Sequence, residues 1–413
     1  MGPLRRYYLK GRIYESLYFG NRQFWVVSIA SCIRSVGFGA SWPFMAIYFN
    51  VSLGISIFYV GIIFTLLSVS SSLFSFLGGF LADRIGRKKT LALGSFAGFF
   101  IYLVIAVLVL TGAGFLIITG VFILSSISGA LIFPSASALV ADVTSVKDRN
   151  SAYSIYRIMS NVGWAIGPIT GGYIAGISVG YIFILMSVTN VLQLVLIVRV
   201  LSDKMKDTST ARPKGYSIDR RILLFAAGTF FVTLVASQFS VTLPVYSTKI
   251  VGILEQQLGY IYAVNGLVVV LGQYPMTWVT RRLNVVTVMI MGSLFYSLGY
   301  FLVALSTNLY GLMIDMVFIT VGENLTTPGM NTVVSRIAPA GKTGRYMGFL
   351  SMANSGGRAV GPSIGAFLMF FFAYRGLEVW GALASLGIVS ISILSIFYFA
   401  VYRSYSSYGT DAV

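Results

Sequence analysis

Long apolar stretches make up most of the chain, and short polar or basic segments separate them. The residues are 57% hydrophobic and only 10% charged. A water-soluble surface normally needs about 25% charged residues, so lipid is the expected solvent and an all-α membrane protein the expected fold class. About twelve stretches reach the roughly 20 residues that a transmembrane helix requires. They lie at approximately 23–49, 56–82, 88–109, 113–141, 150–174, 178–200, 221–248, 257–280, 285–304, 309–335, 344–372 and 377–402.

Lysine and arginine residues predict the orientation of these helices. With the N-terminus in the cytoplasm, 24 of the 29 basic residues fall on the cytoplasmic side, and only Lys249 and Arg375 fall outside. Cytoplasmic loops carry such an excess. Segment 1–22 is basic and lacks the apolar core of a signal peptide. We therefore expect a multi-pass protein of the cell membrane with both termini in the cytoplasm.

Composition also excludes several classes of function. The net charge of +17 comes from basic clusters at the ends of apolar stretches, which membrane insertion requires and nucleic-acid binding does not. The chain contains no histidine, and Cys32 is its only cysteine. No zinc, P-loop or dinucleotide pattern is present. We expect no cofactor, no metal, no nucleic-acid partner and no enzymatic activity.

The two halves of the chain look like repeats of each other. Polar segment 202–220 separates residues 23–201 from residues 221–402, which predicts two six-helix bundles between the terminal segments 1–22 and 403–413. An offset of 194 positions separates Pro134 from Pro328, Gly163 from Gly357, Gly167 from Gly361, and Pro168 from Pro362. Parallel repeats of this kind form transporters in which one half rocks against the other.

The densest charge cluster lies between the second and third apolar stretches. Residues 79–88 read G-F-L-A-D-R-I-G-R-K, which resembles the signature loop of the major facilitator superfamily. The resemblance extends to the twelve helices, the central loop and the repeat. It implies a monomeric transporter in the lipid bilayer that exchanges a small-molecule substrate, with protons as the coupling ion.

This loop is expected to act as a cytoplasmic gate. Gly78 and Gly79 permit close helix packing, and Gly86 permits a tight turn. The resemblance places Asp83 at the start of the eleventh helix, in segment 341–348, where a helix N-terminus attracts an anion. Arg84 or Arg87 is expected to pair with Asp142. The alternative is that the cluster only anchors the topology.

A second motif lies in the fifth apolar stretch. Residues 161–172 read N-V-G-W-A-I-G-P-I-T-G-G, which resembles the antiporter motif of proton-coupled drug exporters. Glycines four residues apart let helices approach closely, so the alternative is packing alone. Ser125 departs from the exporter pattern, because it stands where such exporters carry an arginine. The motif comprises Gly163, Gly167, Pro168, Gly171 and Gly172, and part of it recurs as Gly357, Gly361 and Pro362.

Two acidic residues lie within apolar stretches, and both are in 309–335. A charge in the membrane is costly and therefore suggests a function. Because a buried carboxyl group resists ionisation, Glu323 is the expected proton carrier, with Asp315 as an outer relay or cation contact. The alternative is a structural ion pair between Glu323 and Arg358, for which an acidic partner is expected.

Other polar residues are candidates for contact with the substrate. Arg34 lies near the middle of the first stretch, where it can bind an anionic group or modulate Glu323. The further candidates, each of which can instead be an inter-helix hydrogen bond, are Gln238, Tyr246, Asn265 and Asn324.

The leading interpretation is a secondary transporter that works by alternating access and exports a drug-like or metabolite substrate in exchange for protons. The second interpretation is proton-coupled uptake or exchange of an organic anion anchored by Arg34. A third class, a membrane receptor or enzyme that retained the fold, is disfavoured because the sequence contains neither a soluble domain nor a catalytic constellation.

Overall fold

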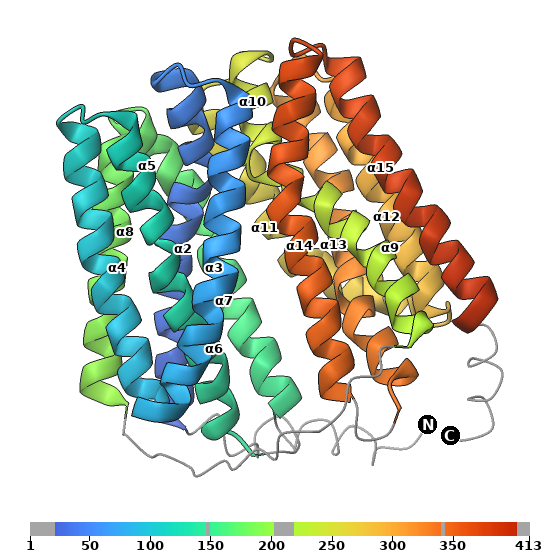
Figure 1. Cartoon of the computed structure of the whole chain (residues 1–413), viewed down its shortest axis with the longest axis horizontal. Coiled ribbons are helices and arrows are strands. Elements are labelled where there is room, and N and C mark those ends of the chain that lie inside the picture. The colour runs from blue at the N-terminus through green and yellow to red at the C-terminus, as the bar shows by residue number, and fades with distance from the viewer. Residues whose placement is uncertain (1–20, 146–148, 202–218, 340–342, 403–413) are drawn as a thin grey trace, which may run out of the picture. The chain divides into compact units, whose positions relative to one another are not determined.

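The computed structural model describes residues 21–145, 149–201, 219–339 and 343–402, and these form helices and no strand (Figure 1). The predicted apolar stretches lie in these helices, which confirms the all-α prediction. The elements are α2 (Arg22–Ile47), η1 (Tyr48–Ser52), α3 (Ile57–Ile85), α4 (Arg87–Leu110), α5 (Phe115–Leu124), α6 (Ser126–Asp142), α7 (Arg149–Ala175), α8 (Val179–Val200), α9 (Arg220–Ala236), η2 (Ser237–Phe239), α10 (Thr242–Lys249), α11 (Glu255–Thr280), α12 (Val285–Val303), α13 (Leu309–Ile337), α14 (Thr343–Phe371), α15 (Gly376–Phe397) and η3 (Tyr398–Tyr402).

Two predicted stretches are interrupted in the structure. Stretch 113–141 is divided into α5 and α6 at Ser125, whose hydroxyl donates to the carbonyl of Phe122 at 2.6 Å. Such local bonds compete with the helical pattern. Stretch 221–248 is divided into α9 and α10 by the short helix η2. Pro134, by contrast, lies inside α6, so serine rather than proline marks the first interruption.

Hydropathy separates the helices into two groups. Among the described residues, eight helical stretches are long and apolar enough to cross a membrane, and α7, α11, α13 and α14 are not among them. Polar residues within a membrane must face other helices or a water-filled space. The four less apolar helices carry most of the candidate residues, including Glu323 and Arg358.

The chain divides into two compact units, each assembled from several stretches of sequence. Unit 1 takes the described residues of Met1–Gly39, Ser70–Gly167 and Gly180–Thr210, and unit 2 takes those of Ala40–Val69, Pro168–Val179 and Ala211–Val413. The boundary between the units therefore falls inside α2, α3 and α7, and after the first residue of α8.

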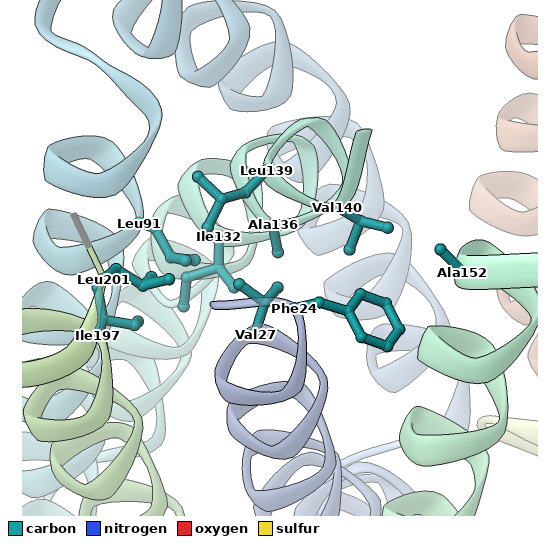
Figure 2. Close-up of a cluster of buried hydrophobic side chains, with 10 residues drawn as sticks. All are labelled: Phe24, Val27, Leu91, Ile132, Ala136, Leu139, Val140, Ala152, Ile197 and Leu201. Atoms are coloured by element: carbon teal, nitrogen blue, oxygen red, sulfur yellow. The ribbon is translucent and has the colours of Figure 1, made fainter. Parts of the chain in front are cut away.

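Unit 1 has an apolar core to which five helices contribute (Figure 2). Burial of such side chains contributes about 1.5–3 kcal/mol each in a soluble protein; in lipid, close packing makes the larger contribution. The core holds α2, α4, α6, α7 and α8 together near the end of α6. Its buried members are Phe24, Val27, Leu91, Ile132, Ala136, Leu139, Val140, Ala152, Ile197 and Leu201.

Aromatic side chains contribute to the core of unit 2. Trp380 of α15 is fully buried and stacks on Tyr300 of α12, with ring centroids 5.7 Å apart. Phe225 of α9 packs on Phe397 of α15 at 5.1 Å. Offset aromatic pairs add about 0.5–1.5 kcal/mol beyond the area they bury, so these contacts fix α9, α12 and α15 against one another.

Small residues let α14 lie directly against α9. A Cβ atom at Gly361 would be 1.8 Å from Ser237 Oγ and 2.6 Å from the carbonyl oxygen of Leu234, whereas a Cβ atom at Gly348 would meet nothing within 4 Å. Gly357 has similar contacts with α9, and its repeat equivalent Gly163 has them with Cys32 of α2. The repeated glycines therefore pack against repeat-equivalent helices.

This packing predicts the effect of an added methyl group. Gly361→Ala is expected to destabilise the protein by about 1–3 kcal/mol, because the backbone of Leu234 must move. Gly348→Ala is the matched control in the same helix, and it is expected to be neutral or to stabilise by up to about 1 kcal/mol. Thermal unfolding in detergent measures both. Equal melting temperatures for the two variants would contradict the packing argument.

Candidate functional site

Glu323 on α13 is half-buried, and its carboxylate is held by a side chain of α11. Asn265 Nδ2 donates to Glu323 Oε2 at 3.1 Å and to Thr320 Oγ1 at 3.0 Å. The hydroxyl of Thr320 donates its own proton to the carbonyl of Met316 at 2.7 Å. Its oxygen is therefore an acceptor for Asn265, which fixes the amide with its nitrogen toward the carboxylate.

Tyrosines of α12 form another side of this site. The side chains of Tyr296 and Tyr300 lie close enough to Glu323 to interact with its charge. Tyr300 stacks on Tyr296 and donates its hydroxyl to the carbonyl of Ala236 at 3.1 Å. Glu323 thus lies among α11, α12 and α13, in a setting of amide and phenol groups.

Asp315 lies two turns before Glu323 on the same helix, about 12 Å along its axis. Its side chain is buried, with 4% exposure, and it accepts a hydrogen bond of 2.6 Å from Ser306. Ser306 belongs to the connection between α12 and α13. This contact ties the connection to α13, and the relay role of Asp315 stays a prediction.

Arg358 requires a correction. Its side chain is exposed and its hydrogen bond in the described structure goes to Ser355, at 3.5 Å, one turn earlier in α14. No ion pair joins Arg358 to Glu323 or to another described acidic residue, so the expected acidic partner of Arg358 is absent from the described chain.

Three further candidates are engaged in contacts inside unit 2. Gln238 is fully buried, donates to the carbonyls of Leu234 and Gly361, and accepts from Thr242. Its bonds connect η2 to α14, which is a packing role. Tyr246 packs edge-on against Trp380 with centroids 5.4 Å apart.

Asn324 also bridges two helices. Its amide nitrogen donates to the carbonyl of Val268 in α11 at 3.1 Å, and Gln273 donates to its main-chain oxygen at 3.2 Å. Its side-chain oxygen is buried and has no hydrogen-bond partner among the described residues. Asn324 therefore joins α13 to α11 beside Glu323, and one acceptor atom is left over.

Arg34 is the candidate substrate contact that lies in unit 1. It is half-buried on α2, and its guanidinium lies 5.7 Å from the ring centroid of Phe38, one turn later. Tyr102 of α4 and Tyr156 of α7 are close enough to interact with its charge. Arg34 makes no hydrogen bond or ion pair with any described residue, and its Nε atom is buried without a partner.

The charged loop lies at another place in unit 1. Gly86 alone connects α3 to α4 and has a φ of 94°, a conformation that glycine adopts readily. Arg87 pairs with Asp142 and donates to the carbonyl of Ala138 at 2.8 Å. Of the two arginines considered, Arg87 is therefore the one that meets Asp142, and Arg84 is exposed. Because the side chain of Asp83 and segment 340–342 lie outside the described residues, the proposed contact between them stays a prediction.

Gly171 and Gly172 of α7 pack closely against two other helices, α2 and α11. In unit 2, a Cβ atom at Gly171 would be 2.3 Å from the carbonyl oxygen of Ala40, and one at Gly172 would be 2.7 Å from that of Glu255. A Cβ atom at Gly259 of α11 would in turn be 2.5 Å from the carbonyl oxygen of Pro168.

Unit 2 also contains a hydroxyl contact between α3 and α14, where Thr65 Oγ1 and Ser363 Oγ are 2.7 Å apart.

Several residues at these sites were missed by the sequence analysis. Thr320 precedes Glu323 by three residues and Phe38 follows Arg34 by four, so helical spacing could have identified both as neighbours on the same face. Tyr102, Tyr156, Tyr296 and Tyr300 come from other helices, and no spacing along the sequence points to them.

A family model confirms the resemblance drawn from the charged loop. The model of the Major Facilitator Superfamily matches residues 27–253 and residues 225–411. Together these matches cover nearly the whole chain and overlap in its middle.

Full-length relatives agree with the family model. An MFS-type transporter, YttB of Bacillus subtilis, is 27% identical over 369 residues, which cover 85% of this chain and 89% of the relative. A Na(+), Li(+), K(+)/H(+) antiporter of Planococcus maritimus is 25% identical, and the match covers 83% of this chain and 88% of the relative. The multidrug resistance protein MdtH of Edwardsiella ictaluri is 24% identical, and the match covers 87% of this chain and 90% of the relative.

Solved structures share the fold. The nucleoside transporter NupG aligns with a TM-score of 0.77 at 11% identity, covering 91% of this chain and 100% of that one. A POT family transporter crystallised with 5-aminolevulinic acid aligns with a TM-score of 0.74 at 15% identity, covering 92% and 96%. These relatives and neighbours are transporters rather than enzymes. The chain belongs to the Major Facilitator Superfamily and is an integral membrane transporter.

Proposed function

We propose that this transporter exports a drug-like or metabolite substrate in exchange for protons and that Glu323 carries the proton. The observation that supports this proposal is the setting of Glu323, a half-buried carboxylate on α13 held by an amide of α11. A carboxyl group removed from water exchanges its proton more readily near neutral pH than an exposed one. Two relatives named for multidrug resistance and cation/proton antiport also favour export.

The residues around Glu323 supply what a proton carrier needs. The nitrogen of Asn265 stabilises the ionised carboxylate, because hydrogen bonds to a charged group are stronger than those to a neutral group. The carboxylate is half-buried among α11, α12 and α13. In the proposed cycle, alternating access changes how much water reaches Glu323, and the proton is bound or released with that change.

The proposed location follows from charge. We place the protein in the cell membrane with both termini in the cytoplasm, because 24 of its 29 basic residues then lie inside. The pair Arg87–Asp142 then lies on the cytoplasmic side. On that side the Arg87–Asp142 pair would form part of a cytoplasmic gate, together with Arg84, Gly86 and Asp83.

Uptake or exchange of an organic anion is the second candidate, and the setting of Arg34 favours it. The two candidates differ in the direction of coupled flux. Export by antiport moves protons opposite to the substrate, whereas symport moves both in the same direction.

Proton flux in liposomes tests the proposal. Purified protein is reconstituted with a trapped pH-sensitive dye, a pH gradient is imposed, and lipophilic cations, neutral compounds and organic anions are added in turn. We expect at least one compound to release protons from the acidic compartment. Protein-free liposomes with the same compounds are the control. Proton movement that accompanies the substrate in the same direction would replace export with uptake, and its complete absence across the panel would contradict proton coupling.

A further inference from the structure

The guanidinium of Arg34 is a fixed positive charge that has no acidic partner among the described side chains of its own unit. The described helices of unit 1 contain two acidic positions, Asp83 and Asp142. Asp142 pairs with Arg87, and the side chain of Asp83 lies outside the described residues. Arg34 itself forms no ion pair with a described residue. A charge within a membrane is costly unless it is paired or hydrated, so an anion is the natural complement.

The hydrogen bonds of Arg34 point to the same conclusion. Arginine has five N–H donors in a planar arrangement that matches a carboxylate or phosphate group. None of them donates to a described residue, and Nε is buried without a partner. An unsatisfied buried donor costs about 1–3 kcal/mol. An arginine used only for packing would be expected to donate to nearby carbonyl oxygens, as Arg87 does to Ala138.

Serines lie beside the two phenols near Arg34. Tyr102 is next to Ser125, and Tyr156 is next to Ser31. Ser31 is in turn 2.7 Å from the hydroxyl of Ser160. This serine contact connects α2 with α7 near Arg34. The guanidinium itself has no acceptor among the described residues.

An aromatic surface adjoins the charge. Phe38 lies one turn after Arg34, and its ring centroid is 5.6 Å from that of Trp164 on α7. Both side chains are half-buried. A charged group beside two aromatic rings suits a ligand that has an anionic end and an apolar body.

We propose that Arg34 binds the anionic group of an organic-acid substrate, whose apolar body packs against Phe38 and Trp164. This inference deepens the proposed function, because it gives the substrate class of the same transporter and holds for export and uptake alike. Arg34 is the anchor, and Tyr102 and Tyr156 are positioning residues. Cationic compounds are expected to bind poorly because of the fixed positive charge.

Equilibrium dialysis of purified protein at constant pH tests this inference. The probes are benzoate, salicylate and 2-naphthoate, each compared with its neutral amide, and the tetraphenylphosphonium cation. We expect at least one carboxylate to bind more tightly than its amide. Arg34→Gln is expected to weaken that binding by about tenfold to a hundredfold. Arg34→Lys keeps the positive charge but not the planar arrangement of donors, so it should lose less binding affinity than Arg34→Gln. Arg157→Gln removes an exposed arginine of α7, and it should leave the binding of every probe unchanged.

The outcomes separate this inference from proton coupling. If no carboxylate binds wild type more tightly than Arg34→Gln, or if amides or the cation bind best, the Arg34 site is wrong. Phe38→Ala should weaken binding of 2-naphthoate more than binding of benzoate, because the larger ring contacts more of the aromatic surface. Dialysis involves no pH gradient, so its result does not depend on whether Glu323 carries protons.

Discussion

Glu323→Gln is expected to reduce substrate-driven proton flux at least about tenfold while leaving the protein folded. Glutamine keeps the size of the side chain and can still accept the hydrogen bond from Asn265, but it cannot bind and release a proton. Loss of an essential proton-transfer group typically costs two orders of magnitude or more. The measurement is the rate of dye response in liposomes, and the melting temperature in detergent checks the fold.

Two variants make this result interpretable. Glu378→Gln removes an exposed carboxylate at the start of α15, 3.9 Å from Arg375, and it should leave the flux unchanged. Asn265→Leu removes both hydrogen bonds from α11 but leaves the carboxylate in place. It is expected to slow the flux about threefold to tenfold, as the loss of a positioning bond implies. Full proton flux in Glu323→Gln would remove Glu323 from the mechanism.

The fold could be predicted from the sequence because membrane insertion imposes a strong pattern. Every backbone group must be satisfied within the bilayer, so apolar stretches of this length become helices. The interruptions at Ser125 and at η2 were not predicted. Local hydrogen bonds of a serine and a glutamine side chain accompany them, at Ser125 and Gln238, and hydropathy does not register such bonds.

The site was predicted in part, and for a physical reason. Glu323 and Arg34 stand out because ionisable residues are rare in transmembrane helices. Their surroundings depend on which faces of neighbouring helices meet, and one sequence does not determine that. Asn265 was predicted as a polar contact, and in the structure it binds Glu323. Arg358 was assigned an acidic partner because it lies in a transmembrane helix, but its hydrogen bond goes to Ser355 and no described acidic residue pairs with it.

The contact between α3 and α14 predicts that a covalent link will stop transport. Thr65 Oγ1 donates to the carbonyl of Ala359 at 2.6 Å, so the hydroxyl of Ser363 is the donor in the 2.7 Å contact between the two side chains. One turn earlier, a Cβ atom at Gly61 would be 2.6 Å from that of Ala366. The two helices therefore touch along a surface of small residues, held by hydroxyl groups.

In the proposed alternating access this contact opens, because α3 belongs to the first predicted half of the chain and α14 to the second. The pair Thr65→Cys and Ser363→Cys, made together with Cys32→Ser, brings two sulfur atoms within reach of a disulfide bond. Oxidation is expected to lower transport at least about tenfold, and reduction to restore it.

A second cysteine pair shows whether transport stops because the α3–α14 contact is locked or because any added disulfide bond makes the protein more rigid. Ser293 and Ser390 lie on α12 and α15, both in the second half of the repeat, with their hydroxyl oxygens 3.5 Å apart. A disulfide between cysteines at these positions joins helices that are not expected to separate, so oxidation should leave transport within about twofold of the reduced protein. Each single cysteine variant, oxidised in the same way, should also transport normally. If the oxidised α3–α14 pair still transports at the reduced rate, this surface stays closed throughout the cycle and the opening takes place elsewhere.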